Sequence, residues 1–452
     1  MGGGLLQLVA YGAQDVYLTG NPQITFFKVV YRRHTNFAME AIQQTFSGIP
    51  GYGNTVYCQI SRNGDLIHRT YLEVKLPKFV TVANKYVNYV GLRLLKSVTV
   101  EIGGQQIDKH YSDWLYIWNE LSLPLGKKSA WDYMVGADSD ITSRNTNGTE
   151  NTLYIPLEFW FCRNIGLALP LIALQYHEVK VKIEFETLNN CAYQITASKT
   201  AAIDTTTDTL AKVAISANLW VDYIFLDTDE RRKFAQLSHE YLIEQLQFTG
   251  QETLNASGSR VKLNFNHPCK ELVWVAKFNT ADSVNQWNNY TVNASDVQPS
   301  ATTTIGGAAP AYAAVDQYIA GSSNVDNTNF TNFLPFNISP GLSIDYKNPF
   351  TTCLLQLNGN DRFAVRDGTY FNDVQPYQHH TNIPNNAGIN VYSFALKPEE
   401  HQPSGTLNMS RIDTAVLAVE AKMSASATIN IYATNYNVLR ILSGMGGLAY
   451  SN

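Results

Sequence analysis

Alternation of apolar and polar residues with a period of two recurs along this chain of 452 residues and constrains its fold more than any other feature. The clearest run is VKVKIEF at residues 179–185, where Lys or Glu separates the apolar positions. Similar runs occur at 55–60, 71–76, 98–102, 261–265 and 429–433. Successive side chains of a strand point to opposite faces, so this pattern predicts strands with one face in a core. Helical periodicity is confined to two short segments, 113–121 and 228–235.

The two halves of the chain look like diverged copies of one unit. Four pairs of segments match in the same order and at similar spacing: 42–48 with 245–250, 58–63 with 261–266, 171–184 with 407–420, and 219–226 with 431–438. Short alternating matches arise between any two antiparallel sandwiches, but the shared order and spacing favour a duplication. The sequence therefore predicts two β-sandwiches of about 200 residues each.

The composition of the chain indicates which kinds of partner the protein can bind. Charged residues make up 16% of the chain, aromatic residues 12%, and the net charge is −5. A surface poor in charge and rich in Tyr and Asn suits contacts with other proteins, although a β-rich fold alone also selects aromatic residues. The longest basic run is residues 231–233, so we expect no direct binding of nucleic acid. The longest apolar run, Ile165–Leu174, is too short to span a bilayer.

The five cysteines are widely spaced and include no CxxC pair: Cys58, Cys162, Cys191, Cys269 and Cys353. This pattern predicts reduced thiols in a chain that folds in a cytosol-like compartment.

The motifs that resemble catalytic or ligand-binding signatures are incomplete. Gly444–Ala449 fits GxGxxA, but too few residues follow for the helix of a dinucleotide site. Residues 138–140 begin like a calcium loop whose turn glycine and final glutamate are missing. His379 and His380 have no carboxylate or cysteine at ligand spacing in their own loop, which favours a solvated pair over a metal site. We therefore expect no catalytic residue, no metal and no cofactor.

Between Phe278 and Phe350 the alternation fails, and small and polar residues dominate. A segment this long is either an elaborated functional loop or a mobile connection. Four Asn-X-Ser/Thr sequons lie in it, and one more lies in a second polar stretch at 127–151. The candidate N-glycosylation sites of the chain are Asn147, Asn255, Asn289, Asn293, Asn329, Asn337 and Asn408. A protein that folds in the cytosol does not meet the standard glycosylation machinery, so any sugar would need another enzyme.

Five longer blocks carry a family resemblance. In chain order they are LVAYGAQDVYLTGNPQITFFKVVYRRHTNF at 8–37, GLALPLIALQYHE at 166–178, WVDYIFLDTDERRKFA at 220–235, HEYLIEQLQFTG at 239–250 and NYNVLRILSGMGGLAY at 435–450. Together they resemble the major capsid proteins of nucleocytoplasmic large DNA viruses, particularly those that infect algae. Because the blocks stand at both termini and in the middle, the resemblance covers nearly the whole chain.

The resemblance implies an all-β fold of two consecutive eight-stranded antiparallel jelly rolls, side by side, with a few short helices and long loops. The expected divisions are an N-terminal arm at 1–25, a first jelly roll at 26–226, a short helical linker at 227–235, and a second jelly roll at 236–452 with a long loop at 278–350. It also implies a structural protein of the virion, assembled in the host cytoplasm. Three copies would form a pseudo-hexagonal capsomer of an icosahedral shell, in contact with neighbouring capsomers.

For the N-terminal arm, the resemblance implies a path along the capsomer base towards minor capsid proteins and an internal membrane. Its apolar anchors would be Leu5, Leu6, Leu8, Val9, Tyr11, Val16, Tyr17 and Leu18. The alternative is that this segment forms an edge strand of the first sheet. Gly2 also suggests N-myristoylation, but Leu6 occupies the position where that motif requires Ser or Thr.

Two other functions stay open. A carbohydrate-binding or carbohydrate-processing β-sandwich would use the abundant Tyr and the seven Trp residues for sugar stacking. It would need paired carboxylates in a cleft or an exposed aromatic row, and the sequence shows neither clearly. A minor capsid or vertex protein of the same lineage is the second alternative, against which the strength of the terminal matches argues.

Overall fold

The computed structural model describes residues 12–77, 84–137, 151–195, 215–255, 258–279, 287–292, 348–384, 387–423 and 426–450, together with residues 4, 7, 8, 10, 79, 200 and 201. Contacts divide the chain into two units, Met1–Phe37 and Ala38–Asn452. The first unit contains the short helix α2 (Val16–Thr19), and all of its described residues are exposed. The second unit holds two β-sandwiches.

The first sandwich is made of two antiparallel sheets. Its main strands are β1 (Phe37–Gln44), β2 (Thr55–Gln59), β3 (Leu66–Leu76), β5 (Leu95–Ile102), β6 (Gln105–Tyr111), β7 (Asn151–Pro156), β9 (Val179–Phe185) and β12 (Ser216–Leu226). Sheet 1A has the order β1-β12-β3-β7, and sheet 1B has the order β2-β9-β5-β6. The remaining strands are β8 (Leu169–Pro170), which pairs with β3, and β4 (Asn84–Tyr86), β10 (Ala192–Ile195) and β11 (Thr200–Ala201), which form a small separate sheet.

The second sandwich is built in the same way. Its main strands are β13 (His239–Leu254), β14 (Ser259–Leu263), β15 (Pro268–Phe278), β16 (Phe350–Leu357), β17 (Asn360–Asp361), β19 (Asn390–Ser393), β21 (Ala415–Ala421) and β22 (Ala427–Leu442). Sheet 2A has the order β13-β22-β15-β19, and sheet 2B has the order β14-β21-β16-β17. Three short strands extend these sheets: β18 (Arg366–Asp367), β20 (Leu407–Asn408) and β23 (Met445–Leu448).

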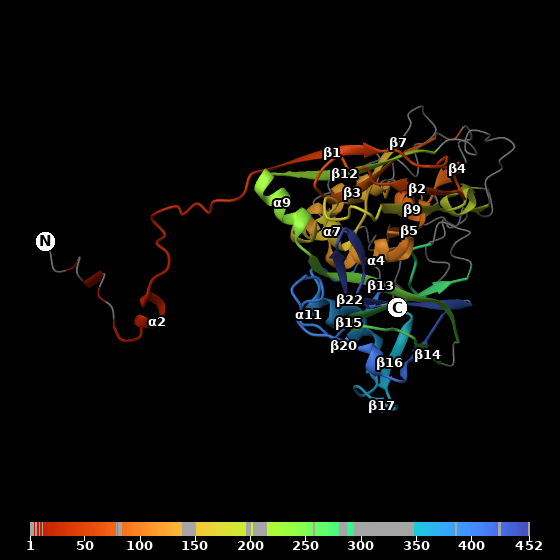
Figure 1. Ribbon diagram of the computed structural model, residues 1–452. Coiled ribbons are helices and arrows are strands. Elements are labelled where there is room, and N and C mark those ends of the chain that lie inside the picture. The colour runs from red at the N-terminus through yellow and green to blue at the C-terminus, as the bar shows by residue number, and fades with distance from the viewer. Residues whose placement is uncertain are drawn as a thin grey trace, which may run out of the picture. The chain divides into compact units, whose positions relative to one another are not determined.

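The two sandwiches share one topology. When the eight main strands of each are counted along the chain, sheets 1A and 2A both have the order 1-8-3-6, and sheets 1B and 2B both have the order 2-7-4-5. This is the connectivity of a jelly roll, so the predicted double jelly roll is confirmed. All four segment pairs that suggested a duplication join strands of the same rank, for example β12 with β22. In Figure 1 the first sandwich (red to yellow) lies above the second (green to blue), with β13 and β22 at the boundary.

The period-two runs of the sequence are strands with one buried face. In β9 the four apolar residues are buried and the Lys and Glu residues between them are partly exposed. The same alternation holds in β2 and β14. These side chains fill the space between the paired sheets, in one core cluster for each sandwich.

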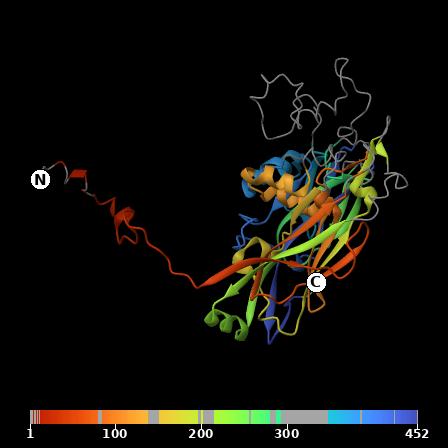
Figure 2. The same cartoon turned by 90° about the horizontal axis from the view of Figure 1, so that it is seen from above.

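Helices are short and lie between strands. The two predicted segments are confirmed as α4 (Ser112–Ser122) and α9 (Thr228–Gln236), the latter capped by Asp227, which accepts a hydrogen bond from the backbone N–H of Thr228. The other helical elements are α3 (Val90–Leu94), α5 (Leu125–Val135), α7 (Trp160–Arg163), η1 (Ile165–Leu167), α8 (Leu188–Cys191), the π-helical turn η5 (Tyr370–Val374), α11 (Gln375–His379) and η6 (Met409–Arg411). Figure 2 shows the orange helices of the first half and the blue helical segment of the second half on the same side of the strands.

Helix α5 corrects the interpretation of residues 127–151 as a polar loop. It spans eleven residues, of which only Trp131 and Val135 are buried. These two residues are four positions apart and so lie on one face of the helix. A single apolar pair is too weak a pattern to reveal a helix in the sequence. In the described part of the chain, no helix is both long enough and apolar enough to cross a membrane.

Candidate functional site: the junction of the two sandwiches

The outer face of sheet 2A, which is turned away from sheet 2B, is covered by the first sandwich. In β15, Leu272 and Trp274 belong to the core cluster of the second sandwich, whereas Val273 and Val275 belong to the cluster that fills the first. Ten of the eleven residues of β15 are buried, including Lys270, Glu271 and Lys277, so this strand lacks the alternation of buried and exposed residues that β9 shows. The two sandwiches therefore share a core, which we call the junction.

Helix α4 of the first sandwich packs on this face. Trp114 of α4 is 1% exposed, and its ring lies 5.5 Å from the ring of Tyr432 on β22. Tyr432 also stacks on Phe248 of β13 at 4.8 Å. Figure 1 shows α4 directly above β22 and β13. Aromatic pairs at these distances add to the stabilisation from area burial by about 0.5–1.5 kcal/mol each.

Two aromatic residues of the long segment after β15 also belong to the junction. Trp287 and Tyr290 are fully buried, and the indole N–H of Trp287 donates to the carbonyl oxygen of Asn88 at 2.8 Å. The hydroxyl of Tyr290 donates to Asp113 at 3.0 Å, and the ammonium of Lys277 donates to the same carboxylate at 3.2 Å. Part of the predicted loop 278–350 is thus core. Composition could not reveal this, because the two aromatic residues stand isolated among polar ones.

Polar side chains close two strand edges at the junction. The side-chain amide of Gln245 on β13 donates to the backbone carbonyl of Ile107 on β6. In return, Asp108 of β6 accepts a hydrogen bond from the backbone N–H of Leu246 at 3.1 Å. Asn437 of β22 donates to Gln245 at 3.0 Å and holds that amide in place. Strand edges are prone to unwanted pairing, and these bonds satisfy one backbone group on each edge without joining the sheets.

A network of charges lies beside this contact. Arg163 of α7 is 3.1 Å from Glu244 of β13, and Lys270 of β15 is 2.8 Å from the same carboxylate. His401 lies 3.7 Å from it. Burial opposes ionisation of Glu244, but His401, Arg163 and Lys270 outweigh that effect and lower the pKa of Glu244 to about 2. Glu244 is therefore an anion at neutral pH and binds elements of both sandwiches.

The structure corrects the expectation of a solvated His379–His380 pair. The side chain of His380 is fully buried, with Nε2 3.0 Å from Glu271 and Nδ1 2.9 Å from Glu399. Burial alone would lower the pKa of His380, but the two carboxylates raise it to about 9. Glu271 belongs to β15 and Glu399 to a later loop, so both partners lie outside the segment that carries the two histidines.

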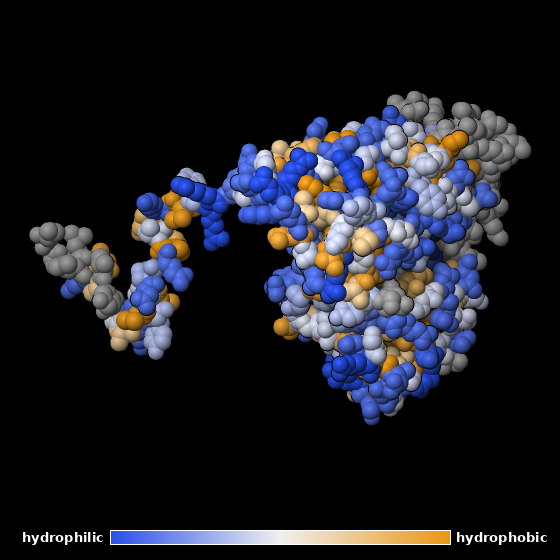
Figure 3. Space-filling model, in the orientation of Figure 1, coloured by the Kyte–Doolittle hydropathy of each residue, from blue (hydrophilic) through white to orange (hydrophobic). Residues whose placement is uncertain are grey.

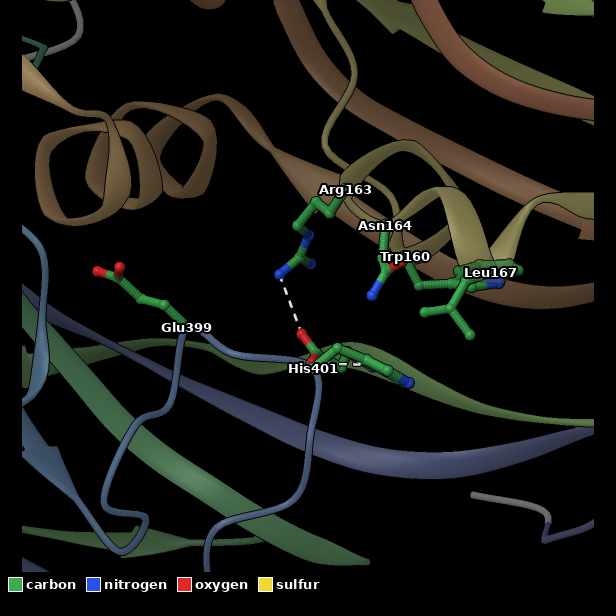
Figure 4. A pocket seen from close by; sticks show the side chains of 7 residues that line it. Trp160, Arg163, Asn164, Leu167, Glu399 and His401 are labelled. Carbon is green, nitrogen blue, oxygen red and sulfur yellow. Dashed lines mark hydrogen bonds and ion pairs between the residues drawn. The ribbon is translucent and has the colours of Figure 1, made fainter. Parts of the chain in front are cut away.

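A small pocket of about 150 Å³ opens at the junction. Its lining comes from both sandwiches: Trp160, Arg163, Asn164, Leu167, Glu244, Glu399 and His401. Figure 4 shows Arg163 reaching into the pocket, while the carboxylate of Glu399 points away on the other side. The charged groups already have partners, since Arg163 binds Glu244 and Glu399 binds His380. Across the described residues, no group of three or more His, Cys, Asp or Glu residues could hold a metal ion.

The GxGxxA stretch forms part of the turn and the second strand of the β22–β23 hairpin, which lies on the first sandwich. The backbone N–H of Tyr176 donates to the carbonyl oxygen of Gly444 at 2.9 Å. His177 Nδ1 lies 2.8 Å from the carbonyl oxygen of Gly446. A Cβ atom on Gly446 would approach Leu174 Cδ2 to 2.6 Å and Ile102 Cγ2 to 3.2 Å. The glycine is therefore needed for close packing across the junction, not for binding phosphate.

The structure describes some of the residues that the sequence predicts to be glycosylated or to anchor the N-terminal arm. Among the sequons, Asn255 and Asn408 are exposed, whereas Asn289 is 5% exposed and accepts hydrogen bonds from the backbone N–H and the hydroxyl of Thr291. Asn147, Asn293, Asn329 and Asn337 lie outside the described residues. Of the arm anchors, Leu8, Val16, Tyr17 and Leu18 are exposed, while Leu5, Leu6, Val9 and Tyr11 lie outside the described residues. All five cysteines are free thiols, and four of them are buried.

Comparison with known proteins gives one consistent result. Two family models match, "Major capsid protein N-terminus" over residues 25–227 and "Large eukaryotic DNA virus major capsid protein" over residues 230–447. The chain is 47% identical to the major capsid protein of Phaeocystis pouchetii virus and 46% identical to that of Paramecium bursaria Chlorella virus 1, with each chain covered in full.

Among solved structures, the chain is similar to the quasi-atomic model of the PBCV-1 virus capsid, with 39% identity and a TM-score of 0.74 over 95% of this chain and all of that one. The Faustovirus major capsid protein is 14% identical, with a TM-score of 0.67 over 96% of this chain and 94% of that one. At that identity the likeness concerns the fold alone.

Proposed function

The chain belongs to the family of large eukaryotic DNA virus major capsid proteins, and from this premise we propose that it builds an icosahedral shell from pseudo-hexagonal homotrimers. Proteins of this family are structural components of the virion capsid rather than enzymes. The proposal adds the copy number and the geometry of the building block. Each copy would contribute two sandwiches, so three copies would supply the six lobes of a hexagon.

The observation that carries the proposal is the burial of β15 and β22, the two central strands of sheet 2A, on both faces. A pseudo-hexagon requires that two sandwiches of one chain keep a fixed relative position, because free rotation would spoil the outline. The shared core, the α4 contact and the Arg163–Glu244 pair fix that position within the single unit Ala38–Asn452. Two sandwiches of the same topology are also what a threefold object needs to resemble a sixfold one.

The proposal extends to the rest of the chain. Residues 1–25 would act as an arm that binds minor capsid proteins near an internal membrane, with exposed Leu8, Tyr17 and Leu18 among its anchors. The two jelly rolls would span 26–226 and 236–452, joined by the helix at 227–235. Assembly would take place in the host cytoplasm. The net charge of −5 supports a shell that does not bind the genome directly.

Glycosylation is proposed only for sequons that an enzyme could reach. Asn255 and Asn408 qualify by exposure, and the four sequons outside the described residues stay candidates. Asn289 is unsuited in the folded protein, because its side chain is buried and bonded to Thr291.

Sedimentation velocity of the purified protein tests the copy number. The chain has a mass of 50.4 kDa, and we expect a single species of three times that mass. Obligate interfaces bury on the order of 2,000–5,000 Å², so the species should persist on dilution to about 1 μM. A stable 50.4 kDa species at that concentration would refute the proposal.

A further inference from the structure

The two sandwiches differ in how far the outer face of the 1-8-3-6 sheet is covered. This sheet is 1A in the first sandwich and 2A in the second. In sheet 2A, the third and eighth strands β15 and β22 are buried on both faces over most of their length. In sheet 1A, the strands of the same rank, β3 and β12, alternate between buried and more exposed residues. The same face is therefore covered in the second sandwich and uncovered in the first.

The uncovered face of sheet 1A carries a row of aromatic side chains. Trp220 of β12 and Tyr71 of β3 are directly paired in register, and their rings stack at 6.3 Å with an interplanar angle of 7°. Tyr154 of β7 follows at 6.2 Å from Tyr71 and is 41% exposed. The indole N–H of Trp220 donates to Glu73 at 2.6 Å, which fixes the orientation of the ring. Partly exposed aromatic groups held in place in this way are typical of binding surfaces.

Trp220 has a counterpart at the junction. When segment 219–226 is aligned with 431–438, Trp220 falls on Tyr432, and both residues point to the outer face of the eighth strand. Within the chain, Tyr432 is covered by Trp114 of α4 at 5.5 Å. The residue that would cover Trp220 in the same way is absent from the described part of this chain, since Trp220 is only partly buried.

The element that corresponds to α4 in the second sandwich is the η5–α11 segment. Helix α4 lies between the fifth and sixth main strands of the first sandwich, and η5–α11 lies between those of the second. Unlike α4, which is almost wholly buried, η5–α11 exposes Val374 to 38% and Tyr377 to 75%. These two residues are three positions apart and lie on one side of the helical segment.

We propose that the aromatic face of sheet 1A binds the η5–α11 segment of a second copy of this chain. The contact repeats between copies the one that α4 makes with sheet 2A inside each copy. It joins two different surfaces head to tail, and such a contact forms a closed ring when the rotation that relates the copies closes. The inference rests on the proposed trimer, for which it identifies the contacting surfaces.

Charge substitutions on the two surfaces test the contact. Tyr154→Glu alters the sheet and Tyr377→Glu alters the helical segment, and both side chains are exposed enough to leave the fold intact. The control is Tyr57→Glu, because Tyr57 is 43% exposed on β2 of sheet 1B, a strand that alternates between buried and exposed residues just as its counterpart β14 does in sheet 2B. We expect either test variant to weaken trimer formation at least about tenfold in sedimentation equilibrium, as for the loss of a central contact. The control should match the wild type, and circular dichroism should show all four proteins folded.

Cross-linking gives a second, positive test. The double variant Tyr154→Cys, Tyr377→Cys, treated with a short bismaleimide, should yield covalent dimers and trimers on a denaturing gel. Either single variant treated in the same way should yield none, which also controls for the natural cysteines.

The outcomes separate the two proposals. A wild-type protein that is monomeric would overturn both the proposed function and this contact. A wild-type trimer that is unaffected by both Glu substitutions and is not cross-linked would overturn the contact alone. If the trimer persists and Tyr154→Glu instead abolishes binding to a glycan array, the aromatic row binds carbohydrate and the inference is wrong.

Discussion

Arg163 and Glu244 lie 3.1 Å apart across the junction, one on α7 of the first sandwich and the other on β13 of the second. The guanidinium of Arg163 also lies 4.5 Å from the ring of Trp118 on α4. The mostly buried Arg163–Glu244 pair therefore lies beside the apolar contact between the two sandwiches. The pair makes the junction specific, because a shifted packing would leave Glu244 buried with fewer partners.

Removal of Arg163 should destabilise the protein. We expect Arg163→Ala to lower the free energy of unfolding by about 2–4 kcal/mol, because Glu244 stays buried and loses one of its cations. Arg440→Ala is the matched control, since Arg440 and Glu240 form a pair at 2.8 Å with both side chains more than half exposed. Its effect should lie within about 0.5 kcal/mol. Urea unfolding measures both, and equal effects would mean that the junction gains nothing from the buried pair.

Because of the His380 cluster, we expect the free energy of unfolding to fall as the pH rises into the alkaline range. The pKa of His380 in the folded protein is about 9, above the value of about 6.5 for an unfolded chain. The stabilisation by the charged imidazole is therefore fully present below pH of about 6.5 and is lost as pH rises through about 9. We expect His380→Gln to remove this stabilisation and so to lower the free energy of unfolding by up to about 3 kcal/mol.

The measurement is the unfolding free energy of the wild type and of His380→Gln between pH 6 and pH 9.5. The difference should be largest at pH 6 and should shrink towards pH 9.5. His379→Gln is the control, because among the described residues His379 bonds the backbone carbonyl of Leu396 and no carboxylate. Its curve should run parallel to the wild type, and a parallel His380→Gln curve would contradict the assigned charge state.

Adding a single methyl group to the C-terminal β22–β23 hairpin should destabilise the protein. Gly446→Ala would place Cβ 2.6 Å from the buried Leu174, and overpacking of this kind costs about 1–3 kcal/mol. At the neighbouring Gly447, the nearest atom to a new Cβ is the flexible end of Gln105 at 3.3 Å. Gly447→Ala should therefore have the smaller effect in thermal unfolding. The reverse order would show that the hairpin does not pack on the first sandwich as described.

Deletion of Met1–Asp15 should separate assembly from folding. The described residues of this segment are exposed, so the truncated protein should fold with an unchanged unfolding midpoint and form trimers. It should fail to form shells when coexpressed with its viral partners, because the arm would no longer reach them. A truncated protein that does not fold would support the edge-strand alternative.

The sequence predicts the sandwiches well because strand burial is a local pattern. Val179, Val181 and Ile183 alternate with charged residues and are buried as expected. The four segment matches join strands of the same rank in the two sandwiches, and the shared topology supports the predicted duplication. Within β15 only Leu272–Ala276 is an uninterrupted apolar run, and so short a run does not by itself reveal burial on both faces of a sheet.

Contacts that depend on distant segments could not be predicted. His380 is cationic because Glu271 and Glu399 approach it from a strand and a loop that are far away in the sequence. Trp287 and Tyr290 enter the junction from a stretch whose composition is that of a loop. On the surface that Figure 3 shows, apolar and polar side chains are interspersed.

Electron microscopy of the purified protein tests the central claim most directly. Averages viewed along the axis of the particle should show a hexagonal outline of six lobes, formed by three chains. A two-lobed particle made of one chain, or a ring with another number of lobes, would contradict the account.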